Sequence, residues 1–257
     1  MQNAHISRHI NRRKHMSTIR LDKYLADAGI GTRTEIKSYI KKGFVTVNGD
    51  IAKKSDIKVD INTDDITFQN EPIKLSLFEY YILNKPAGYV SATKDNTAPT
   101  VLSLIESNRK DLFPVGRLDK DTEGLLLITN DGNLSHRLLS PKRHVDKTYY
   151  VKIKGIVTTD DILAFEKGLE IGDEDLDIAM PAKLTILDIN EQENCSIVHI
   201  TIQEGKFHQV KRMVQAIGKT VTYLQRVSFG PLQLPPELAL GEFRSLTDEE
   251  IKMLQKF

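Results

Sequence analysis

The sequence predicts an α+β protein in which a small N-terminal α/β domain precedes a larger domain, whose largely antiparallel mixed sheet is flanked by helices. Within the first 62 residues, hydrophobic side chains recur at helical spacing and are followed by a short alternating, strand-like segment. In the rest of the chain, strand-like segments outnumber helical ones. They do not alternate regularly with helices, which argues against a parallel β-α-β fold.

Size and composition are those of an ordinary soluble protein. The 257 residues are 40% hydrophobic and 28% charged, and no apolar run approaches the roughly 20 residues that span a bilayer. Residues 1–17 are basic and lack the apolar core of a secretory signal, so they are either a disordered basic tail or an extension ahead of a start at Met16. A single cysteine excludes an internal disulfide and a cysteine-based metal site. We expect a cytoplasmic monomer.

Charge is distributed unevenly along the chain, although the net charge is only +1. Residues 1–62 contain 13 Lys and Arg against 6 Asp and Glu, whereas residues 63–257 contain 23 against 29. A basic module joined to a mildly acidic one suggests an anion-binding N-terminal end, most simply one that binds nucleic acid. A solvated surface would give similar counts, so charge alone does not decide between the two.

Residues 18–62 are predicted to form two short helices followed by a hairpin. Two glycines end the first helix, and Thr32 or Thr34 caps the second. The segment FVTVNG then alternates as a strand that leads into an Asn-Gly turn. Cations on one face of such a module bind a phosphate backbone without reading base sequence. The candidate phosphate contacts are Arg20, Arg33, Lys37, Lys41 and Lys42.

A polar stretch follows this module. We interpret residues 63–77 as a linker, although its DITF segment can still pair as a strand of the first domain. Residues 78–257 form the larger domain. Its strand-like segments are FEYYILNKPAGYV, LLLIT, KTYYVKIKG and CSIVHITIQEG. Its helical segments are TVLSLIES, DGNLSHRLLSP, KFHQVKRMVQAIG and TDEEIKMLQ, the last with Thr247 as a plausible N-cap.

The stretch GRLDKDTEGLLLITNDG, residues 116–132, places acidic residues and an arginine directly before a buried strand. Asp119 would be held at the rim of the core, which suits a catalytic acid, base or nucleophile. Alternatively, Asp119, Asp121 and Glu123 are ordinary turn acids. A third interpretation is the aspartyl-phosphate loop of a magnesium-dependent phosphohydrolase, which has the order Asp-x-Asp-Thr. That loop requires a preceding hydrophobic strand, and Gly-Arg-Leu stands there instead.

Two resemblances cover nearly the whole chain from about residue 18 onward. The segments RLDKYLA and TRTEIKSYIKKGFVTVNG resemble the S4 RNA-binding domain. The stretch GRLDKDTEGLLLITNDG resembles the signature of RsuA-type RNA pseudouridine synthases, and the blocks ILNKPAGYV, SPKRHVDKTYYV and EGKFHQVKRMVQAIG agree in order. This resemblance implies isomerisation of uridine in folded RNA, with the uracil detached and reattached through carbon, and it implies no cofactor and no metal.

The resemblance also implies roles for individual residues. Asp119 corresponds to the essential aspartate, which acts as a nucleophile or as a base. Lys211 would pair with Asp119, although Lys211 and Arg212 can instead bind phosphate. Tyr149 would stack on the target uracil. The alternation of the strand places its neighbour Tyr150 on the opposite side, where we expect it in the core.

Two further cations have implied roles. Arg117 would fill the space left when the target nucleotide is flipped from the RNA stack, as the chemistry requires. A structural ion pair with a nearby acid is its alternative role. Lys85, in the NKPAG block, would support the cleft and contact RNA, and a simple surface turn is nearly as plausible there.

The target RNA is predicted from family features alone. The block FHQVKRM favours the small-subunit branch, since large-subunit relatives tend to have EVRR there, and the long basic tail common in those relatives is absent. We therefore expect small-subunit ribosomal RNA, free or in a partly assembled subunit, as the partner. Large-subunit RNA is the alternative, and an RNA-binding protein with a degenerate catalytic domain is a more remote one.

Overall fold

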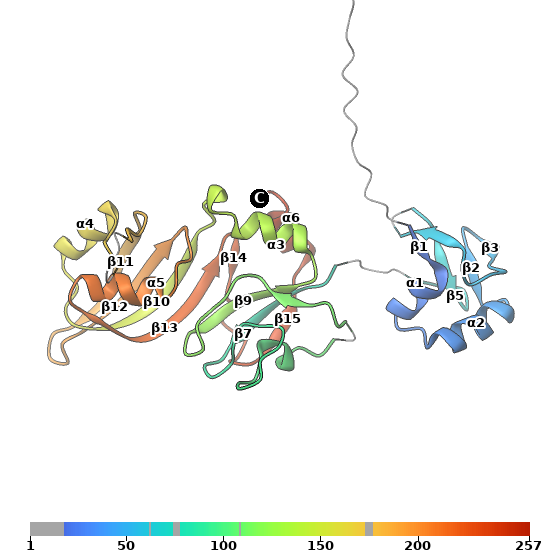
Figure 1. The fold of residues 1–257 in the computed structure, drawn as a ribbon, viewed down its shortest axis with the longest axis horizontal. Helices are drawn as coiled ribbons and strands as arrows, with labels where there is room; N and C mark the ends of the chain where they lie inside the picture. Colours follow the sequence, from blue (N-terminus) through green and yellow to red (C-terminus); the bar gives the residue numbers. More distant parts are fainter. Residues whose placement is uncertain (1–17, 62, 74–77, 108, 173–176) are drawn as a thin grey trace, which may run out of the picture. The chain divides into compact units, whose positions relative to one another are not determined.

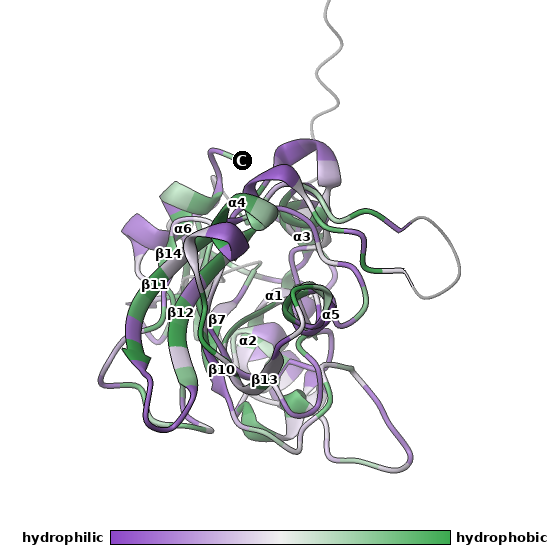
Figure 2. Ribbon diagram, turned by 90° about the vertical axis from the view of Figure 1, so that its left-hand side faces the viewer, coloured by the Kyte–Doolittle hydropathy of each residue, from purple (hydrophilic) through white to green (hydrophobic). Residues whose placement is uncertain are grey.

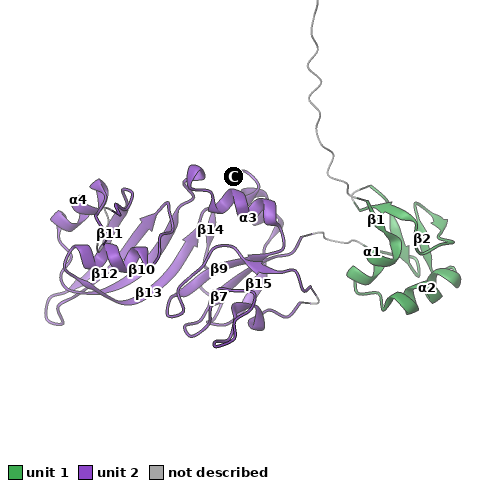
Figure 3. Ribbon diagram, viewed as in Figure 1, with its two compact units in different colours: residues 1–77 green, residues 78–257 purple. Residues whose placement is uncertain are grey.

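The chain forms two compact units, residues 1–77 and residues 78–257 (Figures 1 and 3). This computed structural model describes residues 18–61, 63–73, 78–107, 109–172 and 177–257. The predicted basic tail, residues 1–17, lies outside the described residues. Each unit has its own hydrophobic core and is considered by itself.

The first unit packs two short helices against small antiparallel sheets. Its elements are β1 (Thr18–Arg20), α1 (Leu21–Asp27), α2 (Arg33–Lys41), β2 (Val45–Val47), β3 (Asp50–Ile51), β4 (Lys58–Asp60), β5 (Ile66–Phe68) and β6 (Glu71–Pro72). One sheet pairs β1 with β4, and the other has the order β3-β2-β5-β6. The predicted pair of helices is present, with Thr32 as the cap of α2 and a reciprocal contact from Glu35.

The first unit extends beyond its predicted boundary at residue 62. Strand β5 pairs with β2, and β6 pairs with β5. Ile66 is buried in the core of this unit, and the Tyr24 hydroxyl donates a hydrogen bond to the Ile73 carbonyl at 2.6 Å. The prediction that residues 63–73 belong to a linker is therefore wrong, because the DITF segment completes the sheet. Residues 74–77 of that linker lie outside the described part of the chain.

The second unit is built on one mixed sheet. Its strands are β7 (Tyr80–Lys85), β8 (Phe113–Pro114), β9 (Glu123–Thr129), β10 (Lys147–Lys154), β11 (Lys183–Asn190), β12 (Cys195–Ile202), β13 (Thr220–Phe229), β14 (Leu232–Gln233) and β15 (Phe243–Ser245). Its helices are η1 (Val101–Leu104) and η2 (Pro141–Arg143), both 3₁₀, and α3 (Gly132–Leu139), α4 (Thr159–Lys167), α5 (Gln209–Ala216) and α6 (Asp248–Leu254).

The main path of the sheet runs β11-β12-β10-β13-β9-β7-β15, with β14 paired to β13 and β8 to β9. Every pair in it is antiparallel except β13 with β9. The α+β architecture predicted from the sequence is thus confirmed. Side chains of β12 alternate between buried and partly buried, and Figure 2 shows green apolar segments along this strand interrupted by paler and purple ones.

Strand β9, the LLLIT segment, is buried on both faces. Leu126 and Ile128 pack into one hydrophobic cluster with residues of β10, β12 and α5. Leu125 and Leu127 point the other way, into a second cluster with residues of α3 and α6. The continuous apolar run after the charged turn is explained by this position, because neither face of β9 reaches solvent.

Strands β9 and β13 are joined by a short parallel ladder, Gln225 opposite Glu123 and Arg226 opposite Gly124. Gly124 has φ +100°, and a Cβ added there would lie 2.3 Å from the Arg226 carbonyl oxygen. Only glycine fits this approach. Within the described residues, none of the helices has the length and apolar character needed to cross a membrane.

Candidate active site

Asp119 lies in the loop between β8 and β9, next to the buried Leu118. Ser91 holds this leucine from both sides, because its Oγ accepts the Leu118 N–H at 3.1 Å and donates to the Leu118 carbonyl at 2.9 Å. The Gly88 N–H donates to the Lys120 carbonyl at 2.7 Å on the other side of Asp119. The loop backbone is therefore fixed around the carboxylate, as a preorganised catalytic group requires.

Lys85 contacts the same loop from the protein interior. Its side chain is fully buried, and Nζ donates to the carbonyl oxygens of Thr122 at 2.8 Å, Asp119 at 3.0 Å, Pro86 at 3.1 Å and Lys120 at 3.3 Å. The prediction that Lys85 contacts RNA is wrong, because an ammonium enclosed by backbone carbonyls cannot reach a ligand. The NKPAG block supports the cleft, as expected, but does so from the interior.

Burial lowers the pKa of the Lys85 ammonium to about 8, while the carboxylates of Asp121, Glu123 and Asp119 act in the opposite direction. The ammonium has three N–H donors for four carbonyl oxygens, whereas the neutral amine has only two donors and a lone pair. The charged form is thus the one that fits this arrangement.

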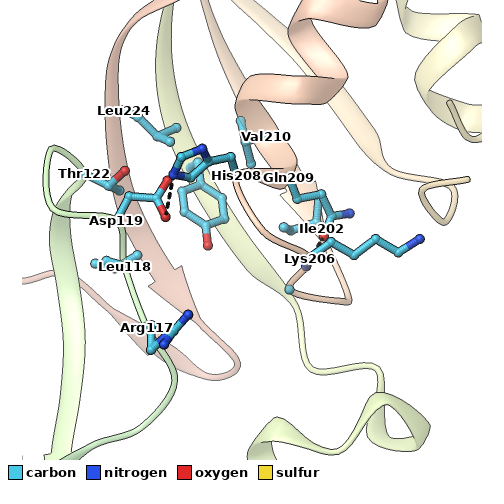
Figure 4. Close-up of a pocket in the computed structure, with 12 residues that line it drawn as sticks. Arg117, Leu118, Asp119, Thr122, Ile202, Lys206, His208, Gln209, Val210 and Leu224 are labelled. Atoms are coloured by element: carbon cyan, nitrogen blue, oxygen red, sulfur yellow. Dashed lines mark hydrogen bonds and ion pairs between the residues drawn. The ribbon is translucent and has the colours of Figure 1, made fainter. Parts of the chain in front are cut away.

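The Asp119 carboxylate faces two side chains at the start of α5. Lys211 Nζ lies 3.4 Å from Asp119 Oδ2. His208 Nε2 lies 3.8 Å from Asp119 Oδ1 (Figure 4). Lys211 makes closer contacts with Asp121, at 2.6 and 2.9 Å, and this hydrogen bond is the main cause that lowers the pKa of Asp121. The pair predicted between Asp119 and Lys211 is present, but Lys211 bridges two carboxylates and does not serve Asp119 alone.

A cavity of about 390 Å³ opens beside Asp119. Arg117, Tyr149 and Lys206 are among its lining residues. Its volume lies within the range of pockets that hold small ligands. Arg117 is exposed and lies two residues before Asp119 on the same loop, with its side chain apart from the carboxylate in Figure 4. None of the ion pairs found among the described residues involves Arg117. The alternative role of Arg117, a structural ion pair with a nearby acid, therefore gains no support.

Tyr149 and Tyr150 lie on opposite faces of β10, as the alternation predicts. Tyr149 is 8% exposed, packs into the core and lines the Asp119 cavity. Tyr150 is only partly buried and contacts the ring edges of His199 and Tyr223. The expectation that Tyr150 is the core residue is therefore wrong, because Tyr149 is the one of the two that packs into the core, where it also lines the cavity.

Arg226 is a site residue that the sequence reasoning missed. A bulge between β10 and β13 skips Val227 and brings Arg226 opposite Tyr149. Its Nε donates to the Leu125 carbonyl at 2.7 Å, and Nη2 has no hydrogen-bond partner among the described residues. Burial lowers the pKa of Arg226, and the neighbouring Tyr149 side chain acts in the opposite direction. An arginine inside the apolar strand YLQRVSF was the available signal.

Comparison with known proteins shows the family of this chain. Residues 79–216, more than half of the chain, match the RNA pseudouridylate synthase family, and residues 19–65 match the S4 domain. The chain belongs to the RNA pseudouridylate synthase family. It is therefore a pseudouridine synthase, as the motif resemblance predicted, and the largely antiparallel sheet leaves no place for the phosphohydrolase alternative.

Relatives of this synthase align over nearly their whole length. An uncharacterized RNA pseudouridine synthase of Bacillus subtilis, YtzG, is 47% identical and covers 93% of this chain and 99% of its own. The ribosomal small subunit pseudouridine synthase A of Vibrio vulnificus is 39% identical (93% and 100%), and the ribosomal large subunit pseudouridine synthase B of Bacillus subtilis is 36% identical (92% and 95%). A crystal structure of a pseudouridylate synthase, 37% identical, covers 92% and 99% with a TM-score of 0.63.

The remaining predicted RNA contacts of the synthase fall into two groups. Arg20 forms a bidentate ion pair with Asp22, and Arg212 pairs with Asp177 at 2.9 Å, so both are already engaged. The others are exposed on α2 or at its end, outside the buried positions Ile36 and Ile40. We call this second group the α2 cations, which are Arg33, Lys37, Lys41 and Lys42.

Proposed function

We propose that this synthase isomerises a uridine of small-subunit ribosomal RNA to pseudouridine, with Asp119 as the essential carboxylate. The observation that supports this most directly is the position of Asp119, which is fixed by backbone contacts at a cavity lined by Tyr149 and Arg117. Lys211 supplies the cation that a carboxylate needs when an entering base excludes water. The S4 domain, through its α2 cations, contributes affinity for the phosphate backbone.

In the proposed reaction, the target nucleotide leaves the RNA stack because its glycosidic bond cannot be reached inside a helix. Arg117 occupies the vacated space, and Tyr149 stacks against the uracil. The bond between ribose C1′ and uracil N1 breaks, the uracil turns, and C1′ bonds to C5. C5 then loses its proton and N1 gains one, so the product is an isomer of the substrate. Asp119 assists as a nucleophile or as a base.

The small-subunit target rests on the block Phe207–Met213, which reads FHQVKRM. The relatives by themselves do not discriminate, since a small-subunit and a large-subunit enzyme are 39% and 36% identical to this chain. Large-subunit ribosomal RNA is therefore the second candidate. Both targets present the same chemistry to the site, and the difference lies in the RNA that surrounds the uridine.

Tritium release from 5-tritiated uridine tests the proposal, because isomerisation expels the C5 hydrogen. We expect release from small-subunit RNA, free or partly assembled, with wild type and none with Asp119→Asn. Asp188→Asn is the control: its side chain is exposed on β11 and lines neither cavity at Asp119, so this variant should retain its activity. Tritium release only from large-subunit RNA would identify that RNA as the substrate. No release from either RNA would contradict the proposed activity and favour a protein that only binds RNA.

The two tyrosines provide a second test. Tyr149→Phe removes the hydroxyl beside the cavity and its contact with Arg226, so turnover should slow. Tyr150→Phe alters the opposite face of the strand and should be mild. Equal effects of the two substitutions on kcat would contradict the assignment of Tyr149 to the site.

A further inference from the structure

Phe207 is the most exposed large hydrophobic side chain among the described residues, at 70%. It lines the same 390 Å³ cavity as Asp119 and Tyr149. Leaving a phenyl ring in water forgoes the stabilisation that burial would give. The mouth of an active site is a place where such exposure serves a ligand.

The ring is supported on one side only. His208, the residue directly before α5, has φ +50°, a left-handed conformation that few residues other than glycine adopt. Its imidazole stacks against the phenyl ring, with centroids 3.8 Å apart and planes inclined by 23°. The other face of Phe207 is open, so a flat partner can add to an existing two-ring stack.

Several side-chain contacts hold the turn that presents Phe207. Asp177 forms ion pairs with Lys206, the residue before Phe207, at 2.6 Å and with Arg212 in α5 at 2.9 Å. Arg212 Nη1 also donates to the Phe207 carbonyl at 3.3 Å, and the Gln209 side chain closes the turn by accepting the Lys206 N–H at 2.9 Å. A ring fixed in this way loses little conformational entropy when a ligand stacks on it.

Charge around the ring favours a nucleic acid as the occupant. Arg117, Lys206 and Lys211 line the cavities on either side of His208, which suits a phosphate backbone that passes the site. Flipping the target uridine also removes a stacking partner from each neighbouring base. An open aromatic face beside the pocket can replace that partner, since every base offers a π-face.

We propose that Phe207, supported by His208, is a stacking platform for an unpaired nucleobase that directly flanks the target uridine in the RNA strand. This assignment rests on the proposed function and adds a subsite to it. Phe207 stacks on the neighbouring base while Tyr149 contacts the target uracil, so the two aromatic residues contact adjacent nucleotides. Stacking of this kind tolerates any base and raises affinity more than it selects sequence.

The first test is kinetic, on whichever ribosomal RNA the wild-type enzyme modifies. Phe207→Ala should raise KM roughly tenfold, within the range that one base–aromatic stack contributes, and leave kcat within about twofold. Phe207→Tyr keeps an aromatic ring and should restore KM. Leu163→Ala is the control: Leu163 is an exposed side chain on α4, away from the cavity, and KM should not change. An unchanged KM for Phe207→Ala would overturn the platform.

The second test does not depend on turnover. RNA with 2-aminopurine in place of the base on the 5′ or the 3′ side of the target is titrated with Asp119→Asn protein. Fluorescence at one of these positions should be quenched by stacking, and adding Phe207→Ala should remove the quenching. Quenching that persists without the ring, or none at either position, refutes the platform. Release of tritium only from large-subunit RNA would refute the proposed small-subunit target, and probes beside the uridine modified there would still test the platform.

A protein partner on Phe207 is the competing occupant. In that case Phe207→Ala would bind RNA and turn over like wild type while losing an interaction with another protein. That outcome counts against the nucleobase platform.

Discussion

Replacing Lys85 with methionine should separate activity from stability. The substitution keeps most of the buried volume but removes the ammonium that contacts four carbonyl oxygens. Two of these carbonyls keep backbone partners, because Asp119 accepts the Thr122 N–H and Lys120 accepts the Gly88 N–H. The carbonyls of Thr122 and Pro86 are left without this donor, and a buried acceptor left unpaired costs about 1–3 kcal/mol; Pro86 is only partly buried, so water can replace part of its loss.

Removing the charge works in the opposite direction. The pKa of Lys85 is about 8 in the folded protein against an ordinary 10.5, and each unit corresponds to about 1.4 kcal/mol. Burial of the charged form therefore costs the fold about 3 kcal/mol at pH values below 8. The two effects nearly cancel, so the free energy of unfolding of Lys85→Met should change by no more than about 2 kcal/mol.

Activity has no such compensation. A loop released from its anchor moves the Asp119 carboxylate, and a displacement of about 1 Å costs on the order of 100-fold in rate. We expect kcat for tritium release to fall by about that factor, while the urea unfolding midpoint stays close to wild type. Lys219→Met is the control: it removes an ion pair with Asp161, 2.8 Å long and remote from the cavity, and should lower stability but not kcat.

The same residue predicts a dependence on pH. As pH rises through about 8, Lys85 loses its proton, the loop loses a donor, and kcat should decrease. Stability should change in the opposite sense between pH 8 and 10.5, since the unfolded chain retains the proton longer than the folded one. A kcat that is unchanged in Lys85→Met, or that parallels the loss of stability in both variants, would refute the anchoring role.

Three further predictions concern other parts of the molecule. In urea titrations, Gly124→Ala should lower the free energy of unfolding by about 3 kcal/mol or more, because the new Cβ would lie 2.3 Å from backbone and φ is positive. Gly132→Ala is the control: it lies in open space on α3, and the substitution should slightly raise the free energy of unfolding. Arg226→Met should reduce kcat roughly tenfold without lowering the unfolding midpoint, since it removes a buried charge together with the contact to Tyr149. Reversing the α2 cations to Glu should weaken RNA binding and reduce the slope of log affinity against log salt, with the catalytic domain still folded.

Much of the fold follows from local patterns. The capping residues Thr32 and Thr247 begin α2 and α6 as the sequence indicates, and the apolar run of β9 is a buried strand. Patterns fail where the sheet gives weak signals. Strand β11 lies at the edge with mostly exposed side chains, and β5 is only three residues long, so neither has enough buried positions to stand out from a loop.

The site was predicted through its motif and less completely through its contacts. Tyr149 lines one pocket together with Asp119, and Lys211 lines a second pocket that also includes Asp119. The burial of Lys85 and Arg226 could not be read from the chain, because charge in a sequence suggests solvent. Whether a cation is enclosed depends on carbonyl oxygens supplied by distant loops and strands, and only the tertiary structure shows those.

The short ladder between β9 and β13 has a consequence for how the enzyme comes into being. Asp119 belongs to the segment that leads into β9, whereas Tyr149, His208 and Lys211 belong to segments on the β13 side of the ladder. A chain in which only the strands on one side of this ladder have formed contains Asp119 without Lys211, or Lys211 without Asp119. If Asp119 and Lys211 act together as proposed, the site is complete only once β13 has joined the sheet, so activity depends on strands far from the carboxylate in sequence.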